Sequence, residues 1–89
     1  MNTLRTPIVV PDGAKLTVNA DVKGELRVRV LDPKGTALPG FDAPDCVPVR
    51  GDSLAHAIQW KASPGLPQGK PLRLEFEMKD ARLYAFEMS

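Results

Sequence analysis

Hydrophobic and polar residues alternate along three stretches of the chain, at residues 15–21, 25–30 and 72–79. A period of two places every second side chain on the same face of a β-strand. One face of each strand then packs on a core while the other meets water, which is typical of antiparallel sheets. The phase of the alternation assigns nine side chains to the core: Leu16, Val18, Leu26, Val28, Val30, Leu72, Leu74, Phe76 and Met78.

Turn-forming residues separate these stretches. Lys23-Gly24 predicts a hairpin between the second and third strands, and Lys79-Asp80-Ala81 predicts a turn between the last two. Asp32-Pro33-Lys34-Gly35 has proline and glycine where a β-turn favours them. Pro11-Asp12-Gly13 ends a first short strand at residues 7–10.

The alternation is interrupted between residues 36 and 52, where prolines and glycines predict a long connection without a regular strand. A strand at 55–61, a loop at 62–70 and a final strand at 82–88 complete the chain. Six or seven strands at this spacing predict an all-β fold, a small antiparallel β-sandwich of jelly-roll-like form.

The inward face of the final strand is ambiguous. Leu83 and Ala85 share one face, whereas Tyr84, Phe86 and Met88 share the other. The second set carries more apolar area, so we expect it to face the core.

Length and charge exclude several classes of protein. Eighty-nine residues make one domain, residues 1–89. Twelve basic and eleven acidic residues give no field that would attract nucleic acid or an anionic membrane. No apolar run is long enough for a signal peptide or a membrane span, so the sequence leaves the localisation unknown.

Candidate catalytic and metal-binding residues are few. Cys46 is the only cysteine and His56 the only histidine, so a disulfide and a four-ligand zinc site are excluded within the chain. A cysteine nucleophile would need His56 within hydrogen-bond reach, but burial as a small apolar residue is the more typical role. A pair of glycosidase carboxylates needs a cleft that so small a domain rarely forms. We therefore predict no enzyme and no catalytic residue.

Three carboxylates, Asp42, Asp45 and Asp52, lie in or beside the long connection. Calcium binds loop carboxylates, but these spacings match no EF-hand, and bracing of turns is the more common role. We predict no cofactor, with calcium as the alternative. Arg50-Gly51-Asp52-Ser53 matches an adhesion tetrapeptide, yet a tight turn explains it equally well.

Aromatic residues suggest a sugar-binding alternative. Trp60, Tyr84 and Phe41 could present a ring to a sugar, or they could be used in the core. In the binding hypothesis, the exposed ring of Trp60 or Tyr84 is flanked by polar groups. The candidate ligand-binding residues are then Trp60, Tyr84, Arg50, Asp52 and Gln59.

The chain also resembles a known module over nearly its whole length. The resemblance lies in Gly40-Phe41, Asp45-Cys46, Pro48, Arg50-Gly51-Asp52-Ser53, Gln59-Trp60-Lys61, Gly69-Lys70-Pro71, Leu72-Arg73-Leu74, Phe76 and Asp80-Ala81-Arg82-Leu83-Tyr84-Ala85-Phe86, with Leu16, Val18-Asn19, Gly24, Val28 and Val30-Leu31 upstream. These residues resemble the C-terminal β-sandwich module of bacterial sialidase-like or invertase-like β-propeller glycoside hydrolases.

The resemblance implies a non-catalytic accessory module of a carbohydrate-active protein. Its expected partner is a catalytic β-propeller domain or a polysaccharide, and the parent protein is commonly exported. Such packing requires an exposed apolar patch, for which Leu31, Leu38, Phe41 and Leu54 are candidates. An exposed edge strand would instead allow a homo-oligomer.

Overall fold

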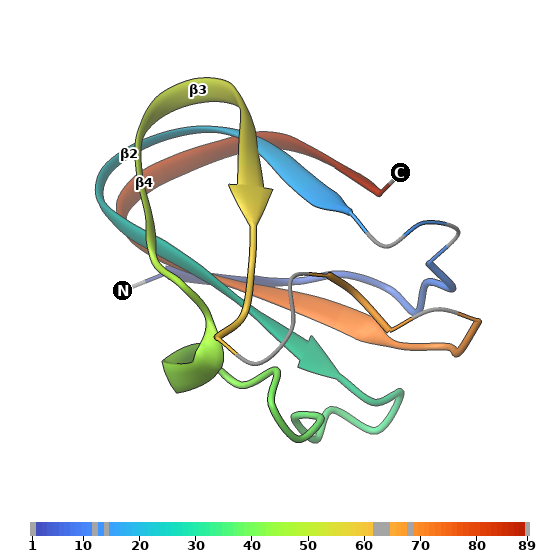
Figure 1. Ribbon diagram of the computed structural model, residues 1–89. Helices are drawn as coiled ribbons and strands as arrows, with labels where there is room; N and C mark the ends of the chain where they lie inside the picture. Colours follow the sequence, from blue (N-terminus) through green and yellow to red (C-terminus); the bar gives the residue numbers. More distant parts are fainter. Residues whose placement is uncertain (1, 12, 14, 62–64, 68, 89) are drawn as a thin grey trace.

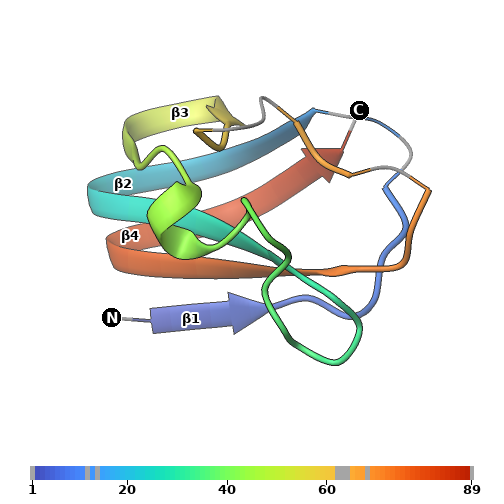
Figure 2. The ribbon, with the colours of Figure 1, turned by 60° about the horizontal axis from the view of Figure 1, so that its bottom comes forward.

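The described part of the chain, residues 2–11, 13, 15–61, 65–67 and 69–88 of a computed structural model, forms one antiparallel β-sheet (Figure 1). Its strands are ordered β1-β4-β2-β3 across the sheet, which Figure 2 shows from one edge to the other. The elements along the chain are β1 (Asn2–Arg5), β2 (Leu16–Leu31), the short 3-10 helix η1 (Ala43–Asp45), β3 (Val49–Ile58) and β4 (Arg73–Met88). The prediction of an all-β, antiparallel fold is confirmed.

Strands β2 and β4 are each 16 residues long and pair from end to end. Midway, the register shifts between Val22 and Glu25 of β2, and both strands turn back on themselves there (Figure 1). Gly24 permits the turn because a Cβ at this position would collide with the carbonyl oxygen of Lys79. Asp80, beside it on β4, has the left-handed φ of 51° that such bends require.

The same bend continues into β3. Gly51 lies opposite Val22 and has a φ of 99°, a conformation that favours glycine. The bend divides the sheet into two limbs. The upper limb contains residues 16–22 of β2, 51–58 of β3 and 81–88 of β4, and the lower limb contains residues 25–31 of β2, 73–79 of β4 and β1.

The hairpin predicted at Lys23-Gly24 and the turn predicted at Lys79-Asp80-Ala81 are therefore wrong. Lys23-Gly24 and Lys79-Asp80-Ala81 lie inside continuous strands, where they form a bend instead of a reversal. Each of these errors divided one continuous strand into two, so the described residues hold four strands in place of the six or seven predicted. A sandwich of two sheets is not confirmed, since these strands belong to one sheet.

Other boundaries also shift. The first strand is predicted at residues 7–10, but the structure places it earlier, at Asn2–Arg5 (β1). Within residues 7–10, only Val9 pairs, through an isolated bridge to Leu72. Strand β3 begins at Val49, inside the predicted connection, and ends at Ile58. The turn from Asp32 to Gly35 is confirmed by a 2.9 Å hydrogen bond from Gly35 N to Asp32 O. The predicted turn at 11–13 and loop at 62–70 lie partly outside the described residues.

The core lies between the two limbs. Eight of the nine side chains that alternation assigned to it are buried, and the ninth, Met78, packs against them. Further buried side chains come from the part of β2 just before the bend, from the end of β3 and from the connections: Ala20, Val22, Ile58, Cys46, Trp60 and Leu66. The bend thus lets one sheet cover both sides of its own core.

The final strand departs from simple alternation at Tyr84. Asn19 pairs with Ala85 and Ala20 with Leu83, so Tyr84 is an extra residue that no residue of β2 opposes. The bulge reverses the alternation, and Leu83 and Phe86 both pack on the core while Tyr84 is 60% exposed. The predicted inward orientation is confirmed for Phe86 and Met88 and is wrong for Tyr84.

Candidate binding surfaces

Trp60 lies in the core and not on the surface. Its side chain is 3% exposed, and its indole Nε1 donates a 2.9 Å hydrogen bond to the Val28 carbonyl oxygen. Phe41 contacts the indole edge to face, with ring centroids 5.2 Å apart. The prediction of an exposed Trp60 ring is therefore wrong, because β2 has a free carbonyl group at Val28 that the indole satisfies.

Cys46 satisfies the other backbone group of Val28, its amide, as Trp60 satisfies the carbonyl. Strand β3 pairs with β2 only as far as Leu26, so the edge of Val28 faces the connection instead of a strand. The Val28 amide donates to Cys46 Sγ at 3.3 Å, and burial raises the pKa of this thiol. Further along, Val30 exchanges hydrogen bonds with Phe41 and Leu38. Side chains and connecting backbone thus close an edge that β3 leaves open.

The three polar candidates do not gather around an aromatic ring. Arg50 and Asp52 are exposed on β3, where Arg50 lies 3.6 Å from a carboxylate oxygen of Glu25. Gln59 is exposed beyond the end of β3, and its backbone carbonyl accepts from Val47. Tyr84 lies on β4, on the other side of β2. The predicted five-residue site is therefore not assembled: Asp52 and Tyr84 lie on different strands of the upper limb, Arg50 and Gln59 lie near opposite ends of β3, and Trp60 is in the core.

The candidate catalytic groups have separate partners. His56 Nε2 lies 3.0 Å from the Ala20 carbonyl oxygen and 2.9 Å from that of Gly51, so this nitrogen is the protonated one. Cys46 instead contacts Val28 and Val47. In the described residues, no hydrogen bond links Cys46 to His56.

The carboxylates of the long connection stabilise η1. Asp42 accepts a hydrogen bond from the Ala43 amide and caps the helix, and Asp45 accepts from the Asp42 amide. The hydrogen bond from the Ala43 amide, together with the nearby Arg29, holds the pKa of Asp42 below its ordinary value. Asp52 lies apart on β3. Within the described ranges, no group of three or more His, Cys, Asp or Glu side chains is placed to hold a metal ion.

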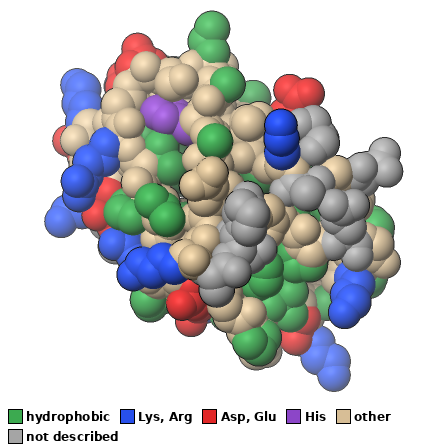
Figure 3. Space-filling model, viewed as in Figure 1, with side chains coloured by type: hydrophobic (Ala, Val, Ile, Leu, Met, Phe, Trp, Pro, Cys, Tyr) green, Lys and Arg blue, Asp and Glu red, His purple; other side chains and the backbone are tan. Residues whose placement is uncertain are grey.

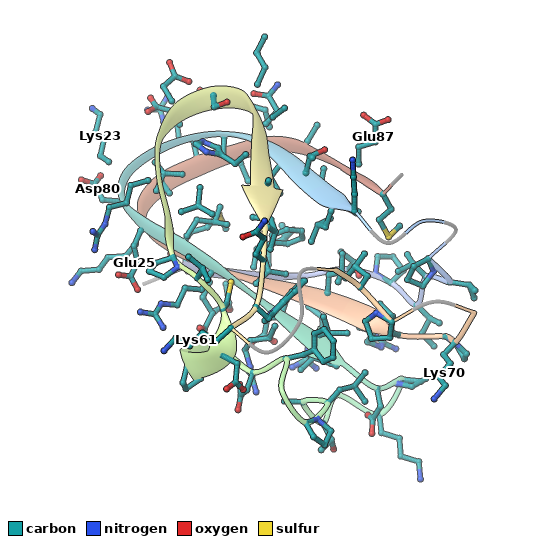
Figure 4. The ribbon with its side chains drawn as sticks, viewed as in Figure 1. Lys23, Glu25, Lys61, Lys70, Asp80 and Glu87 are labelled. Carbon is teal, nitrogen blue, oxygen red and sulfur yellow. The ribbon has the colours of Figure 1, made fainter. Side chains whose placement is uncertain are left out.

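The outer face of the lower limb is a network of ion pairs. Glu75 accepts from Arg5 at 2.8 Å and, through its other oxygen, from Arg29 at 2.8 Å. Arg29 also bonds Asp42 at 2.8 Å. Burial opposes the ionisation of Glu75, but the two arginines outweigh it and hold its pKa below the ordinary 4.5. Figure 3 shows basic and acidic side chains on the side of the molecule where the bend lies, and Figure 4 labels Lys23, Glu25 and Asp80 there.

The outer face of the upper limb has a different character. Small or uncharged side chains lie next to one another across its three strands, with Glu87 beside Thr17 and with Asp21, Asp52 and Arg82 toward the bend. Leu54, on β3, is 83% exposed, the highest value among the large hydrophobic side chains of the described residues. We call this surface the docking face; it consists of Thr17, Asn19, Leu54, Ala57 and Ala85.

Only one member of the predicted apolar patch belongs to this face. Leu31 is fully buried, and Leu38 and Phe41 are partly buried against the core. Leu54 alone is exposed. The others are buried because the connection that follows β2 returns and pairs with its end, as the bridge between Leu31 and Ala37 shows.

An unpaired strand edge is the feature that sequence reasoning did not place. Strand β1 pairs with β4 only up to Met78, so residues 81–88 have a partner on one side alone among the described strands. A groove of about 760 Å³ opens beside this edge, lined by Leu4, Met78, Leu83 and Phe86 with their neighbours. No pattern in the sequence marks this edge, because the strand that covers part of β4 is β1, which alternation did not predict.

Comparison with known proteins yields no family model, curated protein or solved structure that matches the chain. Among the described residues, no helix has the length and hydropathy to cross a membrane.

Proposed function

We propose that the chain is a non-catalytic accessory module of a carbohydrate-active protein, and that it packs against a partner domain through the docking face. The observation that carries the proposal is Leu54, an 83% exposed leucine on the outer face of the upper limb beside the uncharged Asn19 and Ala85. Water-exposed leucines are common singly, but here Thr17, Asn19, Ala57 and Ala85 are uncharged, and Glu87, opposite Thr17, is the charged side chain that lines the same hollow.

The contrast between the two limbs supports the choice of face. Removing the lower limb's outer face from water would complete the burial of Arg5 and Arg29, whose charges are costly to desolvate together with that of the already buried Glu75. On the docking face this cost is smaller, because among the described residues Glu87 is the one charged side chain that lines the shallow hollow of about 240 Å³ beside Leu54, which can receive a side chain of the partner.

The resemblance to the module of sialidase-like and invertase-like β-propeller proteins supplies the class of partner, a catalytic β-propeller. The proposal includes the finer architecture of that module, a jelly-roll-like sandwich in which the two limbs of the bent sheet take the place of two sheets. The wrapped core between the limbs is what supports this interpretation.

The test is the affinity of the domain for an isolated β-propeller domain of a sialidase-like glycoside hydrolase. We expect Leu54→Asp to weaken binding roughly tenfold or more, as loss of a central apolar contact does. Ile8→Asp is the matched control, since Ile8 is also an exposed aliphatic residue (49%) but lies away from the docking face. Equal binding by the wild type and Leu54→Asp would refute this docking face.

The second candidate is a carbohydrate-binding module that uses an exposed aromatic ring. Tyr84, at 60% exposure, is the residue that favours it, since Trp60 is buried. Affinity electrophoresis in polysaccharide gels distinguishes the two. Retardation that disappears in Tyr84→Ala would establish sugar binding, and unretarded migration of the folded domain would leave the accessory module as the proposal.

A further inference from the structure

The free edge of β4, residues 81–88, has a side-chain pattern that reads the same in both directions. Four side chains face the core, at 81, 83, 86 and 88, and four are exposed, at 82, 84, 85 and 87. The centre of this pattern lies between Tyr84 and Ala85. It exists only because the bulge at Tyr84 reverses the alternation halfway along the segment.

Two antiparallel copies of this edge can therefore pair about a two-fold axis. Residues directly opposite in an antiparallel pair must share a face of the sheet. With the axis between Tyr84 and Ala85, Leu83 lies opposite Phe86 of the second copy, and both face inward. Ala81 lies opposite Met88 in the same way, so on both sides of the axis the residues that lie opposite each other share a face of the sheet.

The charges agree with the same register. Arg82 lies opposite the second copy's Glu87, and the symmetry repeats this pair at the other end. In the described residues neither side chain has an ion-pair partner within the chain. Both are exposed, and Figure 4 shows Glu87 at the end of the upper limb far from the bend.

We propose that the partner at this edge is a second copy of the chain, joined through antiparallel pairing of residues 81–88 with Arg82 opposite the second copy's Glu87. The upper limbs then form one continuous sheet across the dimer. The inward Leu83 and Phe86 of each copy lie beside the apolar groove of the other, which removes the exposed edge and the groove from water together. Four of the five docking-face residues lie on β2 and β3 and take no part in this pairing. Ala85 lies in the paired segment, but its side chain is exposed on the outer face while the pairing joins backbone edges, so the dimer does not rest on the proposed function.

The test is the mass and dissociation constant of the domain in solution, measured by sedimentation velocity over a range of concentrations. We expect a species of twice the 9.7 kDa of the chain. Arg82→Glu and Glu87→Arg place like charges opposite each other, and each should raise the dissociation constant roughly tenfold. The double variant Arg82→Glu/Glu87→Arg should return it close to the wild-type value.

Lys70→Glu is the control, since Lys70 is an exposed charge in the segment before β4 and should leave the dimer unchanged. A monomer at every concentration would overturn the proposal. So would a dimer that the double variant fails to restore, because rescue requires these two residues to lie opposite each other. A dimer that Leu54→Asp alone dissociates would instead place the self-contact on the docking face and refute the edge.

Discussion

Gly24 packs so closely on the carbonyl oxygen of Lys79 that no Cβ fits between the two strands. This contact sits where β2 and β4 bend together, and it determines how the molecule is organised. Because both strands pass through the bend without ending, one sheet covers two sides of a core and has two outer faces of different chemistry. Because of this bend, the ion-pair network of the lower limb and the docking face of the upper limb lie on separate surfaces.

The first prediction concerns that contact. Gly24→Ala should lower the free energy of unfolding by about 3 kcal/mol, since the strands must move apart to admit the methyl group. Urea denaturation followed by the fluorescence of Trp60, the only tryptophan, measures it. Gly40→Ala is the control, because Gly40 has a φ of 82° but no atom lies within 4 Å of the place where its methyl group would stand. It should cost only backbone strain, about 1 kcal/mol. Equal losses would contradict the bend contact.

The second prediction concerns Glu75. Glu75→Gln should destabilise the fold by about 2 kcal/mol at neutral pH, since it removes the charge that Arg5 and Arg29 share. The pKa of Glu75 is lowered on folding, so its contribution is present above about pH 4.5 and is lost as the pH falls further. The difference between wild type and variant, measured by urea denaturation, should therefore shrink in acid. A difference that stays constant down to about pH 3 would argue against the ionised pair.

The third prediction concerns the thiol at the edge of β2. Cys46→Ala leaves the Val28 amide without its acceptor and should cost about 2 kcal/mol, whereas Cys46→Ser retains an acceptor oxygen and should cost less. Burial raises the pKa of Cys46 above its ordinary 9.0, so wild-type stability should fall as the pH rises beyond that value. Cys46→Ala should lack this alkaline component. Rapid alkylation of the folded protein at neutral pH would contradict a buried, protonated thiol.

The fourth prediction concerns Trp60. Trp60→Phe keeps much of the ring packing but deletes the hydrogen bond to the Val28 carbonyl, at a cost of about 1–2 kcal/mol. Tyr84→Phe is the matched control, because Tyr84 is 60% exposed and the change should be nearly neutral. Thermal denaturation followed by circular dichroism compares the two. A larger loss for Tyr84→Phe would show that the aromatic residues have been given the wrong roles.

Alternation predicted the strands and the core well because it is a local consequence of having one face buried. It could not distinguish a hairpin at Lys23-Gly24 from a bend, since both require a residue without a side chain at a tight backbone position. The choice depends on Lys79, more than fifty residues away, whose strand pairs with β2 on both sides of the bend. The orientation of the final strand could not be predicted either, because it depends on the bulge at Tyr84, and a bulge is defined only by the register with a partner strand.

The candidate site was harder to predict for the same reason. Trp60 with polar neighbours is compatible with an exposed platform or with a core residue. The difference is the unpaired carbonyl of Val28, which follows from β3 leaving β2 at Leu26. Leu54 was predicted as a docking residue from its apolar character alone, and its exposure follows from the orientation of β3.

The most direct test of the account is an amide NMR titration of the labelled domain with an isolated β-propeller domain of a sialidase-like glycoside hydrolase. We predict that the largest shift changes fall on Thr17, Asn19, Leu54, Ala57 and Ala85, with the lower limb unaffected. Changes confined to the lower limb, or no change at saturating propeller concentration, would contradict the proposal that this module docks through the outer face of its upper limb.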